Sequence, residues 1–187
     1  ETDLGLRKPD YYLNAIGKTT AQTIGSIISK ADEVFNAEKP DALLLYGDTN
    51  SCLSVIAAKR RKIPTFHMEA GNRCYDERVP EELNRKVLDH LSDVNFVLTE
   101  HARRYLINEG VNQEMIIKTG SHMKEVLKSQ EKKIKSSSIL AKLKLKTKKY
   151  FVVSVHREEN LDDETNLFDL LEPMNNLVQK YKMPVVV

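Results

Sequence analysis

The sequence contains few of the residues on which metal, redox and membrane proteins depend. It has two cysteines in 187 residues, Cys52 and Cys74, and their separation matches no metal-binding or redox motif. Free thiols of this kind are typical of a reducing compartment, so we expect the protein to act in the cytoplasm. No run of about 18 apolar residues occurs, and we therefore expect no membrane span.

Glycine-rich motifs are also missing. The seven glycines form neither a Gly-x-Gly-x-x-Gly fingerprint nor a phosphate-binding Walker loop. Histidine, cysteine and acidic residues do not gather at the spacing of a metal site. The sequence therefore gives no support to hydride transfer with a bound nicotinamide, and it predicts neither a metal nor another cofactor.

A strong charge of one sign is absent as well. Lysine and arginine number 29 and aspartate and glutamate 27, so the net charge is +2. This balance gives no general attraction to nucleic acid or to an anionic membrane. The most basic stretch, residues 128–149, holds nine lysines and the single acid Glu131, but no aromatic residue that could stack on a base. We interpret it as a solvated linker, with nucleic-acid binding as the alternative.

What the sequence does contain is a regular alternation of strand and helix patterns. Short apolar runs, typical of buried strands, alternate with stretches in which apolar residues recur every three or four positions, as in helices. Strands are expected over residues 41–46, 63–68, 94–98, 115–118, 150–155 and 184–187. Helices are expected over residues 13–35, 53–62, from Pro80 onwards, 102–108, 121–128 and 163–180. The alternation predicts the α/β class with parallel sheets.

Two domains follow from this order of elements. We expect residues 1–128 to form one Rossmann-like domain, residues 129–149 a basic linker, and residues 150–187 the start of a second Rossmann-like domain. The first domain is expected to lack its opening strands, and the second has barely begun. Because the chain also opens on Glu1 rather than methionine, we expect a central piece of a larger protein, incomplete at both ends.

Ionisable residues follow several of the expected strands. In an open parallel sheet, ligands bind beyond the carboxyl ends of the strands. The pattern brings Asp48, Glu69 and Glu81 to one rim, and His156 to the facing rim of the next domain. Simpler roles stay open: Asp48 could cap the next helix, Glu82 could belong to an ordinary capped helix, and His156 could be a satisfied polar residue.

The remaining histidines are assigned other roles. His90, His101 and His122 fall in expected helices and are treated as structural, and His67 is expected to lie half-buried beside the site. Several carboxylates and one imidazole without a metal suit proton transfer and the stabilisation of an oxocarbenium-like sugar transition state.

Ordered motifs then carry a family resemblance. They are Gly47-Asp48-Thr49, His67-Met68-Glu69-Ala70-Gly71-Asn72-Arg73, Pro80-Glu81-Glu82-Leu83-Asn84-Arg85, Thr99-Glu100, Thr119-Gly120 and His156-Arg157-Glu158-Glu159-Asn160. Together they resemble the non-hydrolysing UDP-N-acetylglucosamine 2-epimerase family, over nearly all of residues 41–165. One such motif has little specificity, whereas the ordered set is highly specific.

The resemblance implies a fold, a set of site residues and a ligand. The fold is of the glycosyltransferase-B type, with two Rossmann-like domains and the active site in the cleft between them. The implied catalytic residues are Asp48, Glu69, Glu81 and His156. The implied substrate-binding residues are Arg73, Glu82, Arg85 and Arg157. The implied ligand is a UDP-N-acetyl sugar, and the implied assembly is a homodimer.

Departures from the family pattern point to one branch. Glu158 stands where the family's loop has a second arginine, and residues 7–11 and 72–79 differ from the plain epimerase. These features resemble the branch that makes UDP-N-acetyl-L-fucosamine from UDP-2-acetamido-2,6-dideoxy-L-talose for capsules and O-antigens. The alternatives are an epimerase that interconverts UDP-N-acetylglucosamine and UDP-N-acetylmannosamine, a glycosyltransferase of the same fold, and a non-catalytic module that binds nucleotide sugars.

Overall fold

The computed structural model describes residues 5–155 and 164–187, and the chain divides into two compact units. The first unit runs to Val126 and the second begins at Leu127. Within the described ranges, no helix combines the length and the apolar character that a membrane crossing requires.

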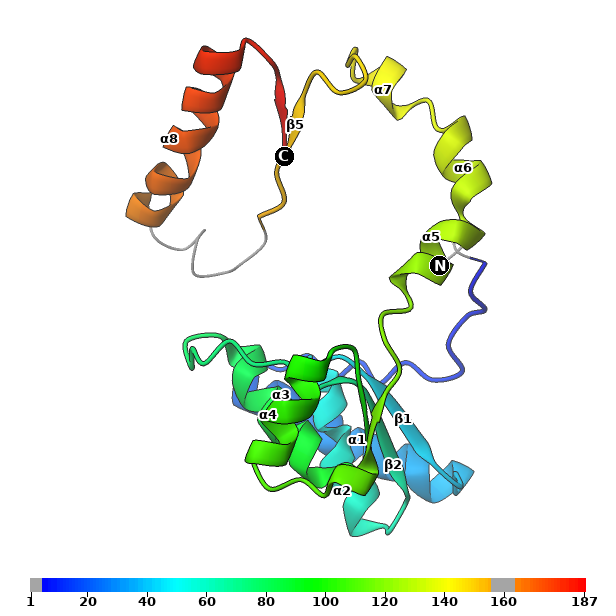
Figure 1. Cartoon of the computed structure of the whole chain (residues 1–187). Coiled ribbons are helices and arrows are strands. Elements are labelled where there is room, and N and C mark those ends of the chain that lie inside the picture. The colour runs from blue at the N-terminus through cyan, green and yellow to red at the C-terminus, as the bar shows by residue number, and fades with distance from the viewer. Residues whose placement is uncertain (1–4, 156–163) are drawn as a thin grey trace. The chain divides into compact units, whose positions relative to one another are not determined.

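A parallel sheet of four strands forms the centre of the first unit (Figure 1). The strands are β1 (Leu43–Tyr46), β2 (Thr65–Ala70), β3 (Val94–Val97) and β4 (Ile116–Lys118), and they lie side by side in chain order. All three pairings are parallel. The carboxyl ends of the strands therefore meet at one edge of the sheet, as the sequence pattern predicts.

Helices precede and connect the strands, and local sequence signals mark where several of them begin. They are α1 (Thr20–Glu38), the short 3-10 helix η2 (Asn50–Ser54) with α2 (Val55–Arg60), α3 (Pro80–Leu91), α4 (Glu100–Asn108) and the 3-10 helix η3 (Gln113–Met115). The expected start of α3 is confirmed, because Pro80 is its first residue. The expected cap of α4 is confirmed too, since the Thr99 side chain accepts a hydrogen bond from the Ala102 amide.

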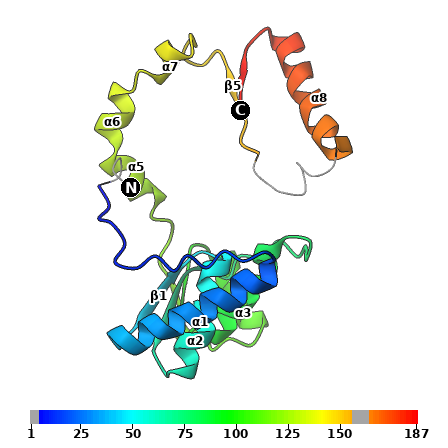
Figure 2. The same ribbon diagram turned by 180° about the vertical axis from the view of Figure 1, so that it is seen from behind.

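Three buried clusters join these helices to one face of the sheet. Their members are Ala31, Phe35, Ala57, Ala58 and Ile63; Leu45, Cys52, Val55 and Leu88; and Ala70, Val97, Ala102, Leu106 and Ile116. Burying a side chain such as Leu88 or Leu106, both 0% exposed, contributes about 1.5–3 kcal/mol. Figure 2 shows α1 on the same side of the unit as α2, against which it packs. The helices thus anchor the sheet from this side.

The first helix is shorter than the sequence predicts. Its apolar periodicity begins at Leu13, but α1 starts only at Thr20, where the Thr19 side chain caps it by accepting a hydrogen bond from the Gln22 amide (3.2 Å). The preceding segment is not helical, and Leu13 nevertheless packs against the cluster that contains Phe35. Leu13 therefore fits the helical period of the sequence although it lies outside the helix.

The second unit contains a smaller parallel pairing. Strands β5 (Phe151–Val152) and β6 (Val185–Val186) pair in parallel. Helix α8 (Glu164–Tyr181) precedes β6, and α5 (Met123–Ser129) crosses the boundary between the units. Two short helices, α6 (Glu131–Ser136) and α7 (Ile139–Lys142), occupy the stretch expected to be a linker. The domain limits drawn from the sequence stay a prediction.

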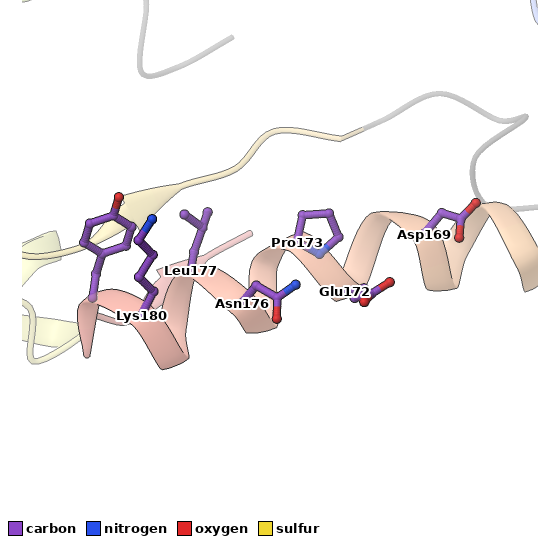
Figure 3. Close-up of a pocket in the computed structure, with 7 residues that line it drawn as sticks. Asp169, Glu172, Pro173, Asn176, Leu177 and Lys180 are labelled. Atoms are coloured by element: carbon purple, nitrogen blue, oxygen red, sulfur yellow. The ribbon is translucent and has the colours of Figure 1, made fainter.

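An open hollow runs along one face of α8 (Figure 3). Every residue that lines it belongs to this helix: Asp169, Glu172, Pro173, Asn176, Leu177, Lys180 and Tyr181. A surface built from a single helix offers no converging groups from other elements, and none of the predicted site residues is among its lining. The predicted site residues that the structure describes lie instead in the first unit.

Candidate active site at the carboxyl edge of the sheet

Asp48 lies directly after β1 and is held from α3. Its Oδ2 atom accepts a hydrogen bond from Arg85 Nε (3.0 Å). The Nη2 atom of the same arginine lies 2.9 Å from this oxygen, so the two side chains form an ion pair. The Asn84 side chain also donates to the Asp48 backbone carbonyl (3.0 Å). Asp48 is not the cap of the following helix, because the N-cap position of η2 is Thr49. Arg85, which the resemblance assigns to substrate binding, thus forms an ion pair with a predicted catalytic carboxylate in this structure.

Glu69 occupies an irregular position inside β2. The sequence predicts a strand that ends at Met68, but β2 continues to Ala70, and its register with β3 shifts between these two residues. At this bulge the Glu69 backbone has φ of +71°, a left-handed conformation that side chains other than glycine seldom adopt. A Cβ placed on Gly47 would lie 3.7 Å from Glu69 Oε2. The bulge therefore directs the Glu69 carboxylate toward the loop that carries Asp48.

Glu81 is the second residue of α3, the helix that also supplies Arg85. Among the residues that the structure describes, neither Glu81 nor Glu69 forms an ion pair. Both side chains are partly exposed. Asp48 is therefore a carboxylate positioned by a cationic partner, whereas Glu69 and Glu81 have no ion-pair partner in the described part of the chain.

Glu82 has a different role from the expected substrate contact. Its side chain is fully buried, and it accepts hydrogen bonds from the amides of Cys74 (3.1 Å) and Tyr75 (3.2 Å) and from Arg85 Nη1 (3.1 Å). Burial alone would raise the pKa of Glu82, but these hydrogen bonds and the nearby Arg85 charge outweigh it and hold the pKa below its ordinary value. Glu82 thus anchors the loop between β2 and α3.

Arg73 also departs from the expected substrate contact. Its side chain is 0% exposed and forms ion pairs with Asp89 (2.7 Å) and Glu109 (2.5 Å). Burial by itself would lower the pKa of Arg73, but the hydrogen bonds to both carboxylates raise it above its ordinary value. A guanidinium enclosed in this way has no surface left for a ligand, so we correct Arg73 to a supporting residue.

Replacing Glu82 by glutamine should destabilise the protein in a pH-dependent way. We expect the free energy of unfolding to fall by about 2 kcal/mol near neutral pH, because the amide loses charge-assisted hydrogen bonds. Since the folded-state pKa of Glu82 is lowered, its contribution is present above the unfolded-state pKa of about 4.3 and disappears as the pH falls through the folded-state value. Urea unfolding at about pH 7 and about pH 3 measures this change.

The neighbouring variant Glu81→Gln is the matched control, because Glu81 lies on the same helical turn and is partly exposed. Its effect on unfolding should be small at both pH values. A Glu82→Gln deficit of equal size in acid and at neutral pH would mean that the glutamate acts through its shape rather than its charge.

Several residues at this edge were not recognised from the sequence. His122 was assigned to a helix, but it precedes α5, and its Nε2 atom lies 3.0 Å from the hydroxyl of Tyr46 at the end of β1. Burial and the negative charge of Glu69 raise the pKa of Tyr46. His67, expected to be half-buried, is 0% exposed. The position of His122 shortly after the last strand of the sheet could have indicated that it lies at this edge.

The remaining expected residues fall elsewhere. His156 and Arg157 lie outside the described residues, as does Glu158. Within the first unit, the structure brings Asp48 together with Arg85 and places Glu69 beside Gly47. In the described part of the chain, this edge holds one carboxylate positioned by an arginine and two carboxylates without an ion-pair partner, a set that suits general acid–base chemistry.

Comparison with known proteins assigns this arrangement to a family. The sequence profile of the family described as UDP-N-acetylglucosamine 2-epimerase matches residues 1–187. The chain is 35% identical over 189 residues to a UDP-N-acetylglucosamine 2-epimerase of Methanococcus maripaludis, covering 98% of this chain and 51% of that protein. It is 36% identical over 186 residues to a UDP-2,3-diacetamido-2,3-dideoxy-D-glucuronate 2-epimerase of Pseudomonas aeruginosa, again covering 98% and 51%. The chain thus spans about half the length of these relatives.

Solved structures agree with this assignment. A UDP-N-acetylglucosamine 2-epimerase from Rickettsia bellii is 58% identical, with a TM-score of 0.92 over 98% of this chain and 48% of that one. The Methanocaldococcus jannaschii enzyme in complex with UDP-GlcNAc and UDP is 29% identical, with a TM-score of 0.88 over 98% of this chain and 51% of that one. The expected α/β fold of glycosyltransferase-B type is confirmed by these matches. The chain belongs to the UDP-N-acetylglucosamine 2-epimerase family.

Proposed function

We propose that the protein carrying this chain is an isomerase that inverts carbon-2 of a UDP-2-acetamido sugar without hydrolysing it. The observation that carries the proposal is the pair of carboxylates, Glu69 and Glu81, that have no ion-pair partner in the described part of the chain. They stand at the edge where parallel sheets bind ligands, next to the Asp48–Arg85 pair. The relatives named above support the same class of reaction.

The proposed reaction is an elimination followed by an addition. A carboxylate takes the proton from carbon-2 while the bond between carbon-1 and the diphosphate oxygen breaks, so that UDP leaves with the bonding electrons and a glycal remains. UDP then adds back to carbon-1, and a proton reaches carbon-2 from the opposite face. Because two opposite faces are involved, two proton-transfer groups are needed, and we assign them to Glu69 and Glu81.

Asp48 has a positioning and electrostatic role in this proposal. Its ion pair with Arg85 fixes its carboxylate at the carboxyl end of β1. A fixed negative group near carbon-1 stabilises the positive charge that develops on the sugar ring as UDP departs. From the family resemblance, we assign contact with the leaving diphosphate to His156 and Arg157.

We propose UDP-2-acetamido-2,6-dideoxy-L-talose as the substrate and UDP-N-acetyl-L-fucosamine as the product, for capsule or O-antigen synthesis. The support is the resemblance of residues 7–11 and 72–79 and of Glu158 to that branch. The alternative pair is UDP-N-acetylglucosamine and UDP-N-acetylmannosamine. Incubation with each UDP-sugar separately, without any acceptor, distinguishes them, and a glycosyltransferase would leave both unchanged. The cytoplasmic location and the homodimer stay predictions.

Epimerisation in heavy water should place deuterium at carbon-2 of the product. The reason is that an elimination releases the carbon-2 proton to a carboxylate that exchanges with solvent before the return step. Proton NMR of the UDP-sugar measures the exchange, and a trace of free UDP and glycal should accompany it. Turnover with complete retention of the carbon-2 hydrogen would exclude this route.

A further inference from the structure

A buried carboxylate on α3 connects the two strand ends that carry Asp48 and Glu69. Asp89 is 0% exposed, and its oxygens lie 2.9 Å from His67 Nδ1 and 2.7 Å from Arg73 Nη1. They also accept a hydrogen bond from the Gly71 amide, at 3.1 Å. One side chain of a helix thus holds both the middle and the end of β2.

The second nitrogen of the His67 ring extends this connection to β1. His67 Nε2 lies 2.9 Å from the backbone carbonyl oxygen of Gly47, the residue before Asp48. A carbonyl oxygen can only accept a hydrogen bond, so Nε2 must carry a hydrogen. Nδ1 faces the Asp89 carboxylate, which is ionised in its pair with Arg73 and can therefore only accept hydrogen bonds. Both ring nitrogens of His67 consequently donate.

The charges of the surrounding groups agree with a doubly protonated ring. Arg73 is a buried cation between two anions, Asp89 and Glu109. Buried charges are tolerated when they are paired. With a cationic His67, the charges of His67, Arg73, Asp89 and Glu109 sum to zero. The more exposed His90, whose Nε2 lies 3.4 Å from Glu109, is counted as neutral. A neutral His67 would leave one excess negative charge in this largely buried cluster.

We propose that His67 is a buried imidazolium and that Asp89 and His67 are positioning residues for the epimerisation. Asp89 holds the ring and the Gly71 amide, and the ring holds the Gly47 carbonyl. The spacing of the Asp48 and Glu69 carboxylates is therefore set from a single residue of α3, the helix that also carries Glu81. This inference rests on the proposed function for its catalytic consequence, whereas the protonation of His67 does not depend on it.

Substituting asparagine for Asp89 keeps the size of the side chain but removes the negative charge. The His67 ring should then lose one proton, because the negative charge that stabilises the imidazolium is gone. The backbone at Gly47 and Gly71 should then be held less firmly, which shifts the neighbouring Asp48 and Glu69 side chains. Small misplacements of catalytic groups cost about tenfold to a hundredfold in rate. We expect this loss in kcat, with little change in KM, since neither residue is placed against the substrate.

The test combines nitrogen NMR with kinetics on the protein that carries this chain. With histidine labelled by nitrogen-15, the ring signals that disappear in His67→Gln identify His67. Both of its nitrogens should appear protonated in the unsubstituted protein, and only one in Asp89→Asn. A single protonated nitrogen in the unsubstituted protein would overturn the imidazolium, whatever the enzyme's activity.

Kinetics then tests the positioning role. Asp93→Asn is the matched control, because Asp93 is an aspartate just beyond α3. Its partners, Lys59 and the Thr65 amide at the opposite end of β2 from Glu69, lie outside this network, so the kcat of the variant should be unchanged. If Asp89→Asn does not fold, His67→Gln, which retains a donor for one acceptor, should show the same fall in kcat. If the unsubstituted protein is active and a folded Asp89→Asn or His67→Gln variant keeps its kcat, the positioning role of these residues is refuted and the epimerase proposal stands. Failure of the proposed function itself would instead appear as a lack of epimerisation by the unsubstituted protein.

Discussion

Replacing Glu69 by glutamine should lower turnover by about a hundredfold or more while leaving the fold intact. Glutamine has the size of glutamate and the same backbone requirements, so the strained conformation at φ of +71° is kept in both proteins. What the variant loses is the carboxylate to which we assign proton transfer at carbon-2. The measurement is kcat for epimerisation of the UDP-sugar, together with the thermal unfolding midpoint.

Glu114→Gln provides the control for this variant. Glu114 lies in η3, away from the carboxyl edge of the sheet, and its side chain is exposed. Its substitution should change neither turnover nor stability. Near-normal turnover of Glu69→Gln, with an unchanged unfolding midpoint, would remove Glu69 from the reaction and leave Glu81 as the first candidate.

Gly71→Ala should be among the most destabilising single substitutions in the first unit. Gly71 has φ of +77°, and a Cβ there would lie 2.6 Å from the Ala102 carbonyl oxygen, a backbone atom that cannot rotate away. The positive φ and the clash act together, and we expect the free energy of unfolding to fall by about 3 kcal/mol or more. Denaturant unfolding measures the loss as a lower midpoint with an unchanged slope.

Gly110→Ala separates the two causes. Gly110 has a similar φ of +88°, but a Cβ there would meet nothing within 4 Å. Its substitution should therefore show the cost of the positive φ alone, about 1 kcal/mol. Equal losses in the two alanine variants would mean that the close approach of β2 and α4 at Gly71 contributes nothing.

Much of the fold could be predicted from the sequence because it depends on local patterns. The apolar runs that became β1 and β3 and the helix starts at Pro80 and Thr99 are signals within a few residues. The expected burial of β1 is wrong, because Leu44 and Tyr46 on one face of the sheet are exposed. The start of α1 was missed because Leu13 matches the helical period while packing from a non-helical segment. The bulge in β2 was missed because it depends on the register with β3, which no short stretch of sequence determines.

The candidate site could be predicted in outline but not in its division of roles. Charged residues in the loop after β2 were assigned to the ligand because their protein partners are distant in sequence. Arg73 pairs with Asp89 and Glu109, which lie 16 and 36 positions further along the chain. Glu82 binds backbone amides, which every residue except proline possesses and which leave no mark in the sequence. Tertiary hydrogen bonds, rather than composition, therefore decide whether a charged residue contacts a ligand or stabilises a loop.

The bulge at Glu69 has a consequence for how such an enzyme is inherited. Glycine would adopt φ of +71° without strain, so folding alone favours glycine at this position over any residue with a carboxylate. A lineage that no longer needs the reaction could accept glycine there and gain stability rather than lose it. On the role that we propose for Glu69, selection for catalysis opposes this replacement, so glycine at this position in a relative would indicate that the epimerisation has been lost.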